Sequence, residues 1–339
     1  MGKIPRLKDI ARESGYSIKT VSRALNNHPD INLKTKQKIL GIAKKYSYHP
    51  NLLARSLRTR KTYTIGYIIP DINNEFFARV GIVIEDEFRK HGYNILISFT
   101  KGQSNWEIES LKLLLSKRVD GVVLATVGET EEYIKKMIHD YKIPIVVIDN
   151  KIDVSGLYFV LHDNVRGAYI LTKHLIEHGH RDIACITGPL KETSGSERLE
   201  GFSRAMDEYG VKINRDFIRV SNWEEEGGFN VTLDLFKSRK SAPTAIFSAN
   251  SVMAIGIYKA LKKLGIKIPD DVAIVSFDDF DFVEILDPPL TTLGNVEKDI
   301  GRKAVEILLD EINGTLEKNM TKEYRFGSEL ILRKSCGCE

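Results

Sequence analysis

Short runs rich in isoleucine and valine recur along residues 63–339, and stretches of helical period lie between them. The amphipathic stretches include residues 105–116, 165–177 and 251–264. The apolar runs have the length and composition of buried strands, and they cover residues 65–69, 94–99, 121–124, 143–148, 183–186, 245–247 and 272–277. Strands that alternate with helices predict parallel sheets with helices on both faces. This part of the chain is therefore expected to be an α/β core.

The α/β core is expected to consist of two similar halves. It has too many strands for one comfortable domain, and the alternating pattern restarts near His162. Two doubly wound parallel sheets would leave a cleft between them, and open parallel sheets bind ligands beyond the carboxyl ends of their strands. Polar residues that directly follow the strands are thus candidates for a binding site.

The first 61 residues differ in charge from the rest of the chain. They hold 15 Lys and Arg residues against three Asp and Glu residues, a net charge of +12. The remaining residues hold 35 basic and 43 acidic side chains, so the whole-chain value of +4 hides a basic head on an acidic body. A small module with this charge density is expected to bind a partner that carries phosphate groups.

Cysteine content and hydropathy limit where the protein works. Three cysteines, Cys185, Cys336 and Cys338, are an odd number for a long chain, so a disulfide framework is not expected. Residues 1–25 lack the continuous apolar stretch of a signal peptide, and no run approaches the roughly 20 apolar residues of a membrane span. We therefore expect a cytoplasmic protein without a membrane partner.

The basic head has the pattern of a helix-turn-helix. Residues 7–14 predict a helix that ends at Gly15, and Ser17 is a good N-cap for a second helix over residues 17–26. Two short helices joined by a glycine-containing turn are typical of this motif. Asn32 can cap a third helix. A basic three-helix module could instead bind a protein or RNA, because charge shows attraction to phosphates and not base reading.

Side chains of the second helix are candidates for reading base pairs. The spacing of Ile18, Val21 and Leu25 puts them on one face, which favours a core position for Ile18. Arg23 is the candidate for a bidentate contact with guanine, with Lys19 beside it.

A short basic segment over residues 51–58 follows Pro50. It is too short to be a stable helix alone, and its leucines have no evident core to join. A segment that orders on DNA, with Leu57 wedged between base steps from the minor groove, fits this pattern. A linker whose leucines pack on the neighbouring domain fits it as well.

Two stretches together resemble the lactose-repressor (LacI/GalR) family of bacterial transcriptional regulators: LKDIARESGYSIKTVSRALNNHPDI and YSYHPNLLARSLRTRKTYTIGYIIPDINNEFF. The similarity runs from about Leu7 to Cys336, with the motifs in the family's order. It implies a helix-turn-helix DNA-binding domain with a hinge helix, then a periplasmic-binding-protein-like core whose halves are joined by three crossovers. It also implies a homodimer on pseudo-palindromic operator DNA, with the first helix of the core in the dimer interface.

The resemblance assigns roles to residues of the head. It places Ile18, Lys19 and Arg23 where the second helix faces bases, which revises the core position that spacing gave Ile18. Leu57 matches the intercalating leucine of the hinge helix, and Arg58 follows it. Contacts with the DNA backbone are implied for Ser17, Thr20, Asn26 and Tyr48.

Residues near the strand ends of the core supply the chemistry of an effector pocket. They comprise carboxylates, amides, an arginine and aromatic rings: Asn74, Phe76, Phe77, Asp149, Arg198, Trp223, Asn250 and Asp278. Paired hydroxyls of a sugar need bidentate polar partners, and its C–H face packs on an aromatic ring. Each Asp or Asn could also be an ordinary turn residue at a strand end.

The resemblance places these residues, other than Asn74, at effector-contacting positions and adds Asn295. Three departures fall near the pocket: Asn295 stands where the family commonly has Gln, Ser251 where it usually has Asp, and Glu75 where it usually has Pro. Trp223 favours a sugar over a purine.

Metal-binding and catalytic motifs are not expected. His174, His178 and His180 are close in sequence, but no carboxylate accompanies them as a third ligand. Cys336 and Cys338 lack a second pair of ligands. The phosphate-binding and nucleophile motifs of common enzymes do not occur. We therefore expect no metal, no cofactor beyond a small-molecule effector, and no enzyme.

The predicted organisation has four parts: a helix-turn-helix domain over 1–50, a hinge over 51–61, one core half over 62–162 and 291–322, and the other over 163–290 and 323–339. The expected function is repression of carbohydrate-utilisation genes under control of a sugar in the cleft. One alternative is a catabolite-control-type regulator that responds to a phosphoprotein. The other is a sugar-binding transport protein or a sugar-metabolising enzyme, which would leave the basic head unexplained.

Overall fold

The computed structural model describes residues 5–25, 27–48, 61–237, 242–294, 296–316 and 322–338. The chain divides into two compact units, Met1–Thr62 and Tyr63–Glu339, which we call the head and the body. Each unit has its own hydrophobic core. Among the described residues, no helix has both the length and the apolar character needed to span a membrane.

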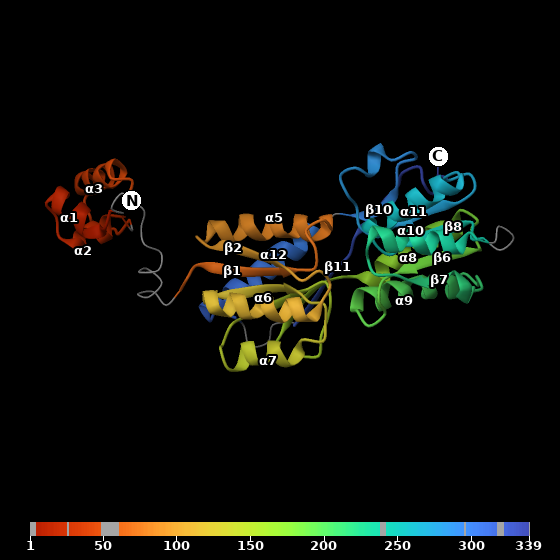
Figure 1. Ribbon diagram of the computed structural model, residues 1–339, viewed down its shortest axis with the longest axis horizontal. Coiled ribbons are helices and arrows are strands. Elements are labelled where there is room, and N and C mark those ends of the chain that lie inside the picture. The colour runs from red at the N-terminus through yellow and green to blue at the C-terminus, as the bar shows by residue number, and fades with distance from the viewer. Residues whose placement is uncertain are drawn as a thin grey trace. The chain divides into compact units, whose positions relative to one another are not determined.

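The described part of the head contains three helices around a small core (Figure 1): α1 (Leu7–Ser14), α2 (Ile18–Leu25) and α3 (Leu33–Lys45). Gly15 ends α1 with a φ of 76°, which a residue without a Cβ adopts at little cost. Asn32 caps α3, because its side-chain oxygen accepts a hydrogen bond from the first turn at 2.8 Å. Ile10, Val21 and Ile39 fill the core between the helices. The predicted helix-turn-helix is confirmed.

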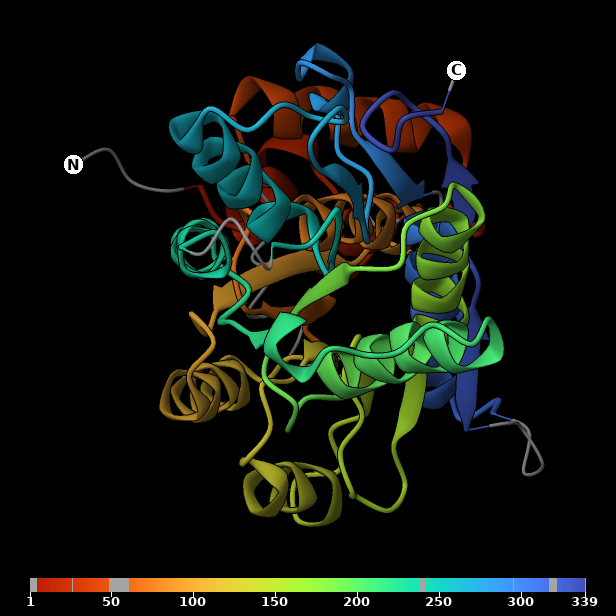
Figure 2. The same cartoon turned by 90° about the vertical axis from the view of Figure 1, so that its right-hand side faces the viewer.

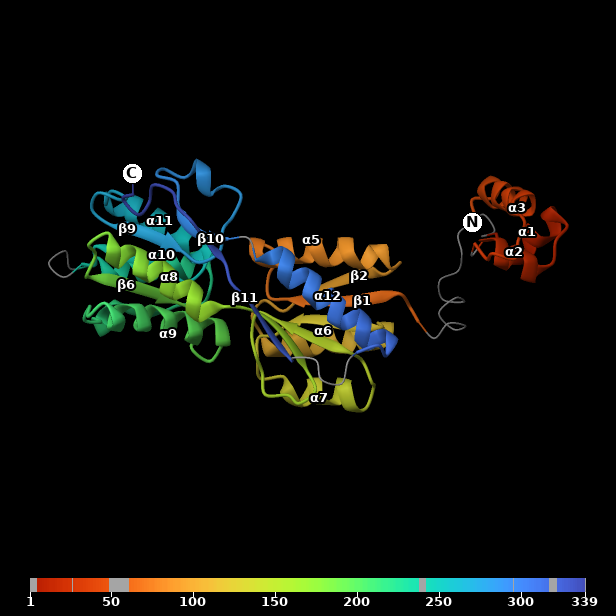
Figure 3. The same ribbon diagram turned by 180° about the vertical axis from the view of Figure 1, so that it is seen from behind.

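The first half of the body is a six-stranded parallel sheet in the order β11-β5-β4-β3-β1-β2. Its strands are β1 (Thr64–Ile69), β2 (Asn94–Phe99), β3 (Gly121–Ala125), β4 (Ile145–Ile148), β5 (Tyr158–His162) and β11 (Glu323–Phe326). Alternate side chains of β1 enter two cores, with Tyr67 on one face and Ile68 on the other. Four helices cover the two faces in pairs (Figures 1 and 3), with α5 (Glu75–Lys90) and α12 (Glu297–Asn313) opposite α6 (Ser104–Lys117) and α7 (Glu131–His139).

The second half is a six-stranded sheet in the order β12-β10-β9-β8-β6-β7. Its strands are β6 (Ile183–Thr187), β7 (Ile218–Val220), β8 (Ala245–Ser248), β9 (Ala273–Ser276), β10 (Thr291–Gly294) and β12 (Glu329–Ile331). Only β12 runs antiparallel to its neighbour among these described strands. The helices pack in two pairs on either side of the sheet (Figure 2): α8 (Asn164–Glu177) with α9 (Thr193–Glu208), and α10 (Glu225–Leu235) with α11 (Ser251–Leu264).

The chain passes between the two halves three times, as the family resemblance implied. It leaves the first sheet after β5, returns after β10, and crosses again between β11 and β12. The last two crossings differ from the expected boundaries, because β10 pairs in the second sheet and β11 in the first. Residues 291–294 thus lie with the second half and residues 323–326 with the first. Strands of four residues carry too short a pattern to show which sheet they join, since tertiary packing sets their pairing.

Candidate functional site

The second helix of the head presents an exposed face to solvent. Ser17 directly precedes α2, and its hydroxyl oxygen accepts a hydrogen bond from the Thr20 amide at 3.1 Å. Val21 is buried, whereas Ile18 is 53% exposed and Lys19 is exposed beside it. The core position that spacing alone favoured for Ile18 is therefore wrong. An exposed isoleucine next to a lysine is the arrangement that the family resemblance implied.

Arg23 and Tyr48 are two further residues of the head that were predicted to contact DNA. The Arg23 guanidinium is half-buried, and its Nη1 lies 3.9 Å from a carboxylate oxygen of Asp30. Tyr48 packs against the head core, and burial raises the pKa of its phenol. Three further residues predicted to contact DNA, Asn26, Leu57 and Arg58, lie outside the described residues.

A pocket of about 710 Å³ lies in the body beyond the carboxyl ends of β1, β3, β4, β8 and β9. This volume is within the range of roughly 300–1,000 Å³ typical of small-molecule sites. Strand ends from both sheets meet here, as expected for two parallel sheets that face each other. The pocket brings together every described residue predicted to contact the effector: Asn74, Phe76, Phe77, Asp149, Arg198, Trp223, Asn250 and Asp278. Asn295 lies outside the described residues.

Arg198 is the buried cation of the pocket. It is 4% exposed and lies on α9, where its Nε donates a hydrogen bond to Asn164 at 2.9 Å. Its Nη1 donates to the Ala249 carbonyl and lies 3.7 Å from Asp278. The guanidinium also stacks 3.8 Å from the centre of the Phe277 ring. These contacts fix the guanidinium plane, and a guanidinium held in one orientation is suited to donate two hydrogen bonds to one ligand.

Two carboxylates flank this arginine at the ends of β4 and β9. Burial raises the pKa of Asp278 to about 6, although the Arg198 charge lowers it. Burial likewise raises the pKa of Asp149 to about 6, again opposed by Arg198. Asp149 and Asp278 adopt left-handed backbone conformations, with φ of 68° and 66°. Non-glycine residues rarely adopt these angles, and such strain is found preferentially at binding sites.

Trp223 supplies an aromatic wall that is held from three sides. Its indole nitrogen donates a hydrogen bond to Glu192 at 2.7 Å. Its carbonyl accepts from the Asn250 amide at 3.1 Å. Gly188 lies against the ring, since a Cβ built there would lie 2.0 Å from a ring carbon. Trp223 also has a positive φ of 67°, so several contacts cooperate to hold its position.

Asn74 and Asn250 also have the structural role that asparagine commonly plays at the end of a strand. Each side-chain oxygen caps a helix: Asn74 accepts from an amide of α5 at 3.1 Å, and Asn250 accepts from an amide of α11 at 2.8 Å. Phe76 and Phe77 follow in α5 and pack edge to face, with ring centres 5.2 Å apart. Both rings are buried and line the pocket.

Two residues that support the predicted contacts, Glu192 and His162, were not identified from the sequence. Glu192 follows β6 and orients Trp223, so the search for polar residues after strands could have found it. His162 ends β5 behind Asp278, with its Nδ1 4.0 Å from that carboxylate and without a hydrogen-bond partner among the described residues. Burial, together with the Arg198 charge, holds the pKa of His162 well below its usual value. A neutral buried histidine gives no pattern in the sequence.

Polar contacts connect the two halves around the pocket. The side-chain oxygen of Asn150, after β4, accepts hydrogen bonds from the amide and the hydroxyl of Ser194, both at 3.0 Å. Arg79 of α5 pairs with Asp281, which follows β9. A ligand between the halves can therefore change these contacts.

A basic helix-turn-helix on a chain whose body holds a pocket with charged and polar residues between two sheets of mainly parallel strands defines a ligand-responsive DNA-binding protein. Residues 6–51 match the family of "bacterial regulatory proteins, lacI family". Residues 62–330 match "periplasmic binding proteins and sugar binding domain of LacI family". The chain belongs to the LacI family, whose members are transcriptional regulators. It is accordingly a DNA-binding transcriptional regulator with a domain for a small-molecule effector.

Individual relatives cover nearly the whole chain. The chain is 31% identical over 329 residues to the HTH-type transcriptional repressor PurR of Pasteurella multocida (strain Pm70), which spans 97% of this chain and 98% of that protein. It is 33% identical to the ribose operon repressor of Haemophilus influenzae, with coverage of 97% and 96%. A LacI family regulator from Enterococcus faecium, solved with bound ribose, superposes with a TM-score of 0.71 at 29% identity, over 80% of this chain and 98% of that one.

Proposed function

We propose that this protein represses carbohydrate-utilisation genes and responds to a small uncharged sugar such as ribose. The observation that carries the proposal is a buried arginine between two carboxylates, beside a fixed indole ring: Arg198 with Asp149, Asp278 and Trp223. Carboxylates and a guanidinium can each hold a pair of hydroxyls, while the indole face covers the C–H side of a sugar ring.

The charge of the pocket lining favours an uncharged ligand. The lining carries six carboxylates, from Asp71, Asp149, Glu192, Glu224, Glu225 and Asp278. Its cations are Lys101, Lys191 and Arg198, of which Lys191 already pairs with Glu129 at 2.7 Å. A phosphate or carboxylate ligand would meet a surplus of negative charge, and like charges at close range are costly in a buried site. The names of the ribose operon repressor and the ribose-bound relative agree with this choice.

On the DNA side, α2 is proposed to enter the major groove with Ile18, Lys19 and Arg23 toward the bases. Ser17, Thr20, Asn26 and Tyr48 would contact the sugar-phosphate backbone. Leu57 would intercalate between base steps, with Arg58 beside it.

A homodimer is proposed to present two heads to a pseudo-palindromic operator, since twofold symmetry of the protein is mirrored in the DNA. Exposed apolar side chains on the body fit such an interface. Ile82 on α5 is 63% exposed, and Ile285 in the segment after β9 is 83% exposed, with Phe282 nearby in sequence. Burial of these side chains against a second copy would remove apolar surface from water.

The effector is proposed to act on the contacts between the halves. A sugar that binds Asp149 of the first half and Arg198 of the second prefers one relative rotation of the two sheets. That preference biases the spacing of the two hinge segments in the dimer and so the affinity for operator. The coupling is reciprocal, so operator must change sugar affinity by the same factor.

The protein is further proposed to act in the cytoplasm and to have no catalytic activity. The polar side chains of the described pocket are arranged to bind a ligand. Its arginine and its asparagine caps are held by internal hydrogen bonds.

The test is thermal unfolding of the purified full-length protein against pentoses, hexoses, sugar phosphates and purines. A ligand at about 100 times its Kd adds roughly 2.7 kcal/mol to the stability of the domain that binds it. We expect ribose or a related sugar to stabilise the wild type and not Trp223→Ala. Trp106→Ala is the matched control, because Trp106 is exposed on α6 and does not line the pocket. Stabilisation by phosphorylated ligands alone, or by a phosphoprotein and no sugar, would contradict the proposal.

A further inference from the structure

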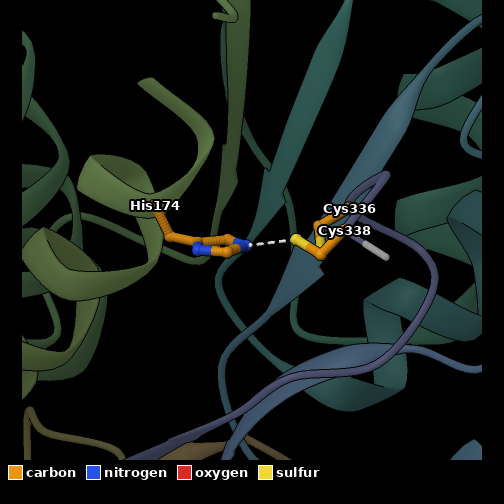
Figure 4. Close-up of side chains that lie close together, drawn as sticks. All are labelled: His174, Cys336 and Cys338. Atoms are coloured by element: carbon orange, nitrogen blue, oxygen red, sulfur yellow. Dashed lines mark hydrogen bonds between the residues drawn. The ribbon is translucent and has the colours of Figure 1, made fainter. Parts of the chain in front are cut away.

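A pair of histidines, His174 and His178, meets a pair of cysteines, Cys336 and Cys338, about 160 residues later in the chain, in the second half of the body. His174 lies in the last turn of α8, and Cys336 and Cys338 lie in the C-terminal segment after β12. One potential ligand atom of each residue lies within 4.8 Å of those of the other two. The His174 ring points toward the sulfurs (Figure 4), and its Nε2 lies 3.1 Å from the Cys338 Sγ.

His178 adds a fourth potential ligand. It lies one helical turn beyond His174, with the two ring centres 4.2 Å apart. Its Nε2 lies 3.3 Å from the Cys338 Sγ. Its Nδ1 lies 2.8 Å from the His174 carbonyl oxygen, which only accepts hydrogen bonds, so Nδ1 must carry the hydrogen. In the neutral ring the lone pair is then on Nε2, which faces the sulfur. Histidine ligands of metals are commonly oriented by such a bond to a backbone carbonyl.

The cysteine turn is anchored to the sheet. Gly337 separates the two cysteines and has a φ of 80°, a conformation that favours glycine. The preceding Ser335 donates a hydrogen bond to the Ile274 carbonyl at 2.6 Å. Cys336 is 1% exposed, and the Thr291 hydroxyl lies 3.2 Å from its sulfur. A backbone held in this way keeps the two thiols in place before any ligand arrives.

We propose that His174, His178, Cys336 and Cys338 form a binding site for one Zn²⁺ ion. Two thiols and two imidazoles are a donor set of structural zinc sites, and soft sulfur ligands disfavour Mg²⁺ and Ca²⁺. Zinc bonds of about 2.3 Å to sulfur and about 2.0 Å to nitrogen place tetrahedral N and S ligands about 3.5 Å apart. The observed separations of 3.1 and 3.3 Å from the Cys338 Sγ require only a small outward movement. His178 lies outside the set of three residues whose ligand atoms are all within 4.8 Å of one another, so its ring must also move to complete the four ligands.

The two histidines alone, or the two cysteines alone, provide only two of the four ligands, and the fold brings the two pairs together. Zinc would bind the deprotonated thiols and release their protons to solvent, with no change in oxidation state. The ion would tie the C-terminal segment to α8. None of the four residues lines the effector pocket, so metal binding and sugar binding can be tested separately.

The test is Co²⁺ titration of the reduced, metal-free, full-length protein, followed by displacement with Zn²⁺. We expect one Co²⁺ per chain, with a thiolate-to-cobalt charge-transfer band and the strong visible absorption of tetrahedral Co²⁺, both removed by Zn²⁺. Cys338→Ser and His178→Gln should lose or weaken these bands and the rise in Tm that Zn²⁺ gives the wild type. Cys338 and His178 are not fully buried, so these variants should still fold.

His180→Gln is the matched control, since His180 lies two residues beyond His178 and bonds to Thr244 instead. It should keep the full bands. Absence of a thiolate-to-cobalt band in the wild type would overturn the site. Retention of the band in a Cys336→Ser, Cys338→Ser double variant would overturn it too.

Discussion

Replacement of Asp278 by asparagine is expected to make the body more stable while removing its response to effector. Asp278 is buried between Arg198 and His162, and burial raises the pKa of this carboxyl from 3.8 to about 6. The ionised form is thus less favourable in the folded protein than in water, even with the arginine nearby. Asparagine keeps the shape and removes the charge. Its amide can also donate a hydrogen bond toward the unpartnered Nδ1 of His162.

The size of the effect follows from linkage between pKa and stability. Each pKa unit is worth about 1.4 kcal/mol, so the rise from 3.8 to about 6 corresponds to about 3 kcal/mol. Because the pKa of Asp278 is higher in the folded than in the unfolded protein, its contribution of about 3 kcal/mol to the free energy of unfolding is fully present below pH 3.8. The wild type loses this contribution as the pH rises through about 6. Asparagine does not titrate, so the variant does not lose stability in this way as the pH rises. Its advantage should therefore grow between about pH 4 and pH 6 and stay constant at about 2–3 kcal/mol above that range.

The assay is urea unfolding of both proteins at equal concentration from pH 4.5 to pH 8. Groups that titrate alike in both proteins cancel in the difference between them, which leaves the Asp278 carboxyl and its charge interaction with Asp149. Asp270→Asn is the matched control, since Asp270 is an exposed carboxylate of the same half and its loss should change stability little at any pH. An asparagine variant that is less stable than the wild type at pH 7, or a difference that does not vary with pH, would refute the reasoning.

Three further variants test other parts of the account. Arg23→Ala should weaken operator binding by about 1–3 kcal/mol and relax base choice at one position, measured by binding to a set of operator mutants; an equal loss on random DNA would contradict base reading. Gly188→Ala should lower sugar affinity by about tenfold or more in calorimetry and spare operator binding, because the new methyl group displaces the Trp223 ring; unchanged affinity would show that the ring is not a contact. Leu57→Ala should reduce operator bending in a gel-mobility assay and leave non-specific binding intact, and full bending in the variant would exclude intercalation.

The longer strands of the fold were predictable from their apolar runs. All seven predicted runs overlap a strand of the body, and the segment predicted over 251–264 is α11 with the same ends. The missed strands β7, β10, β11 and β12 have three or four residues, and β7, β11 and β12 lie at sheet edges. The edge strands bury little surface, β10 is buried but has only four residues, and none of the four is long enough to show a period, so their pairing depends on contacts that the local sequence does not contain. The missed β5 has five residues, of which all but the last, His162, are apolar or aromatic, so it could have been recognised.

The pocket was predictable to the extent that polar residues follow strands. Asp149, Asn250 and Asp278 were found in this way, and the structure brings them into one pocket. Trp223 was predicted as a contact; Glu192 could have been found as a polar residue after β6, but its hydrogen bond to the indole depends on tertiary packing that the local sequence does not contain. The same limit hid the cysteine–histidine cluster, because each of its halves looks incomplete until the fold joins them. Ile18 shows the opposite case, in which spacing predicted burial and the helix instead exposes the side chain.

The most direct test of the central claim is operator affinity measured with and without saturating ribose. The operator would first be selected from a random duplex pool with the full-length protein, and binding followed by fluorescence anisotropy at fixed salt. The account predicts a pseudo-palindromic site whose affinity for the wild type changes with ribose, and an Asp278→Asn variant that binds the same site but does not respond. An operator affinity that is the same with ribose, or with any other neutral sugar that saturates the pocket, would contradict it.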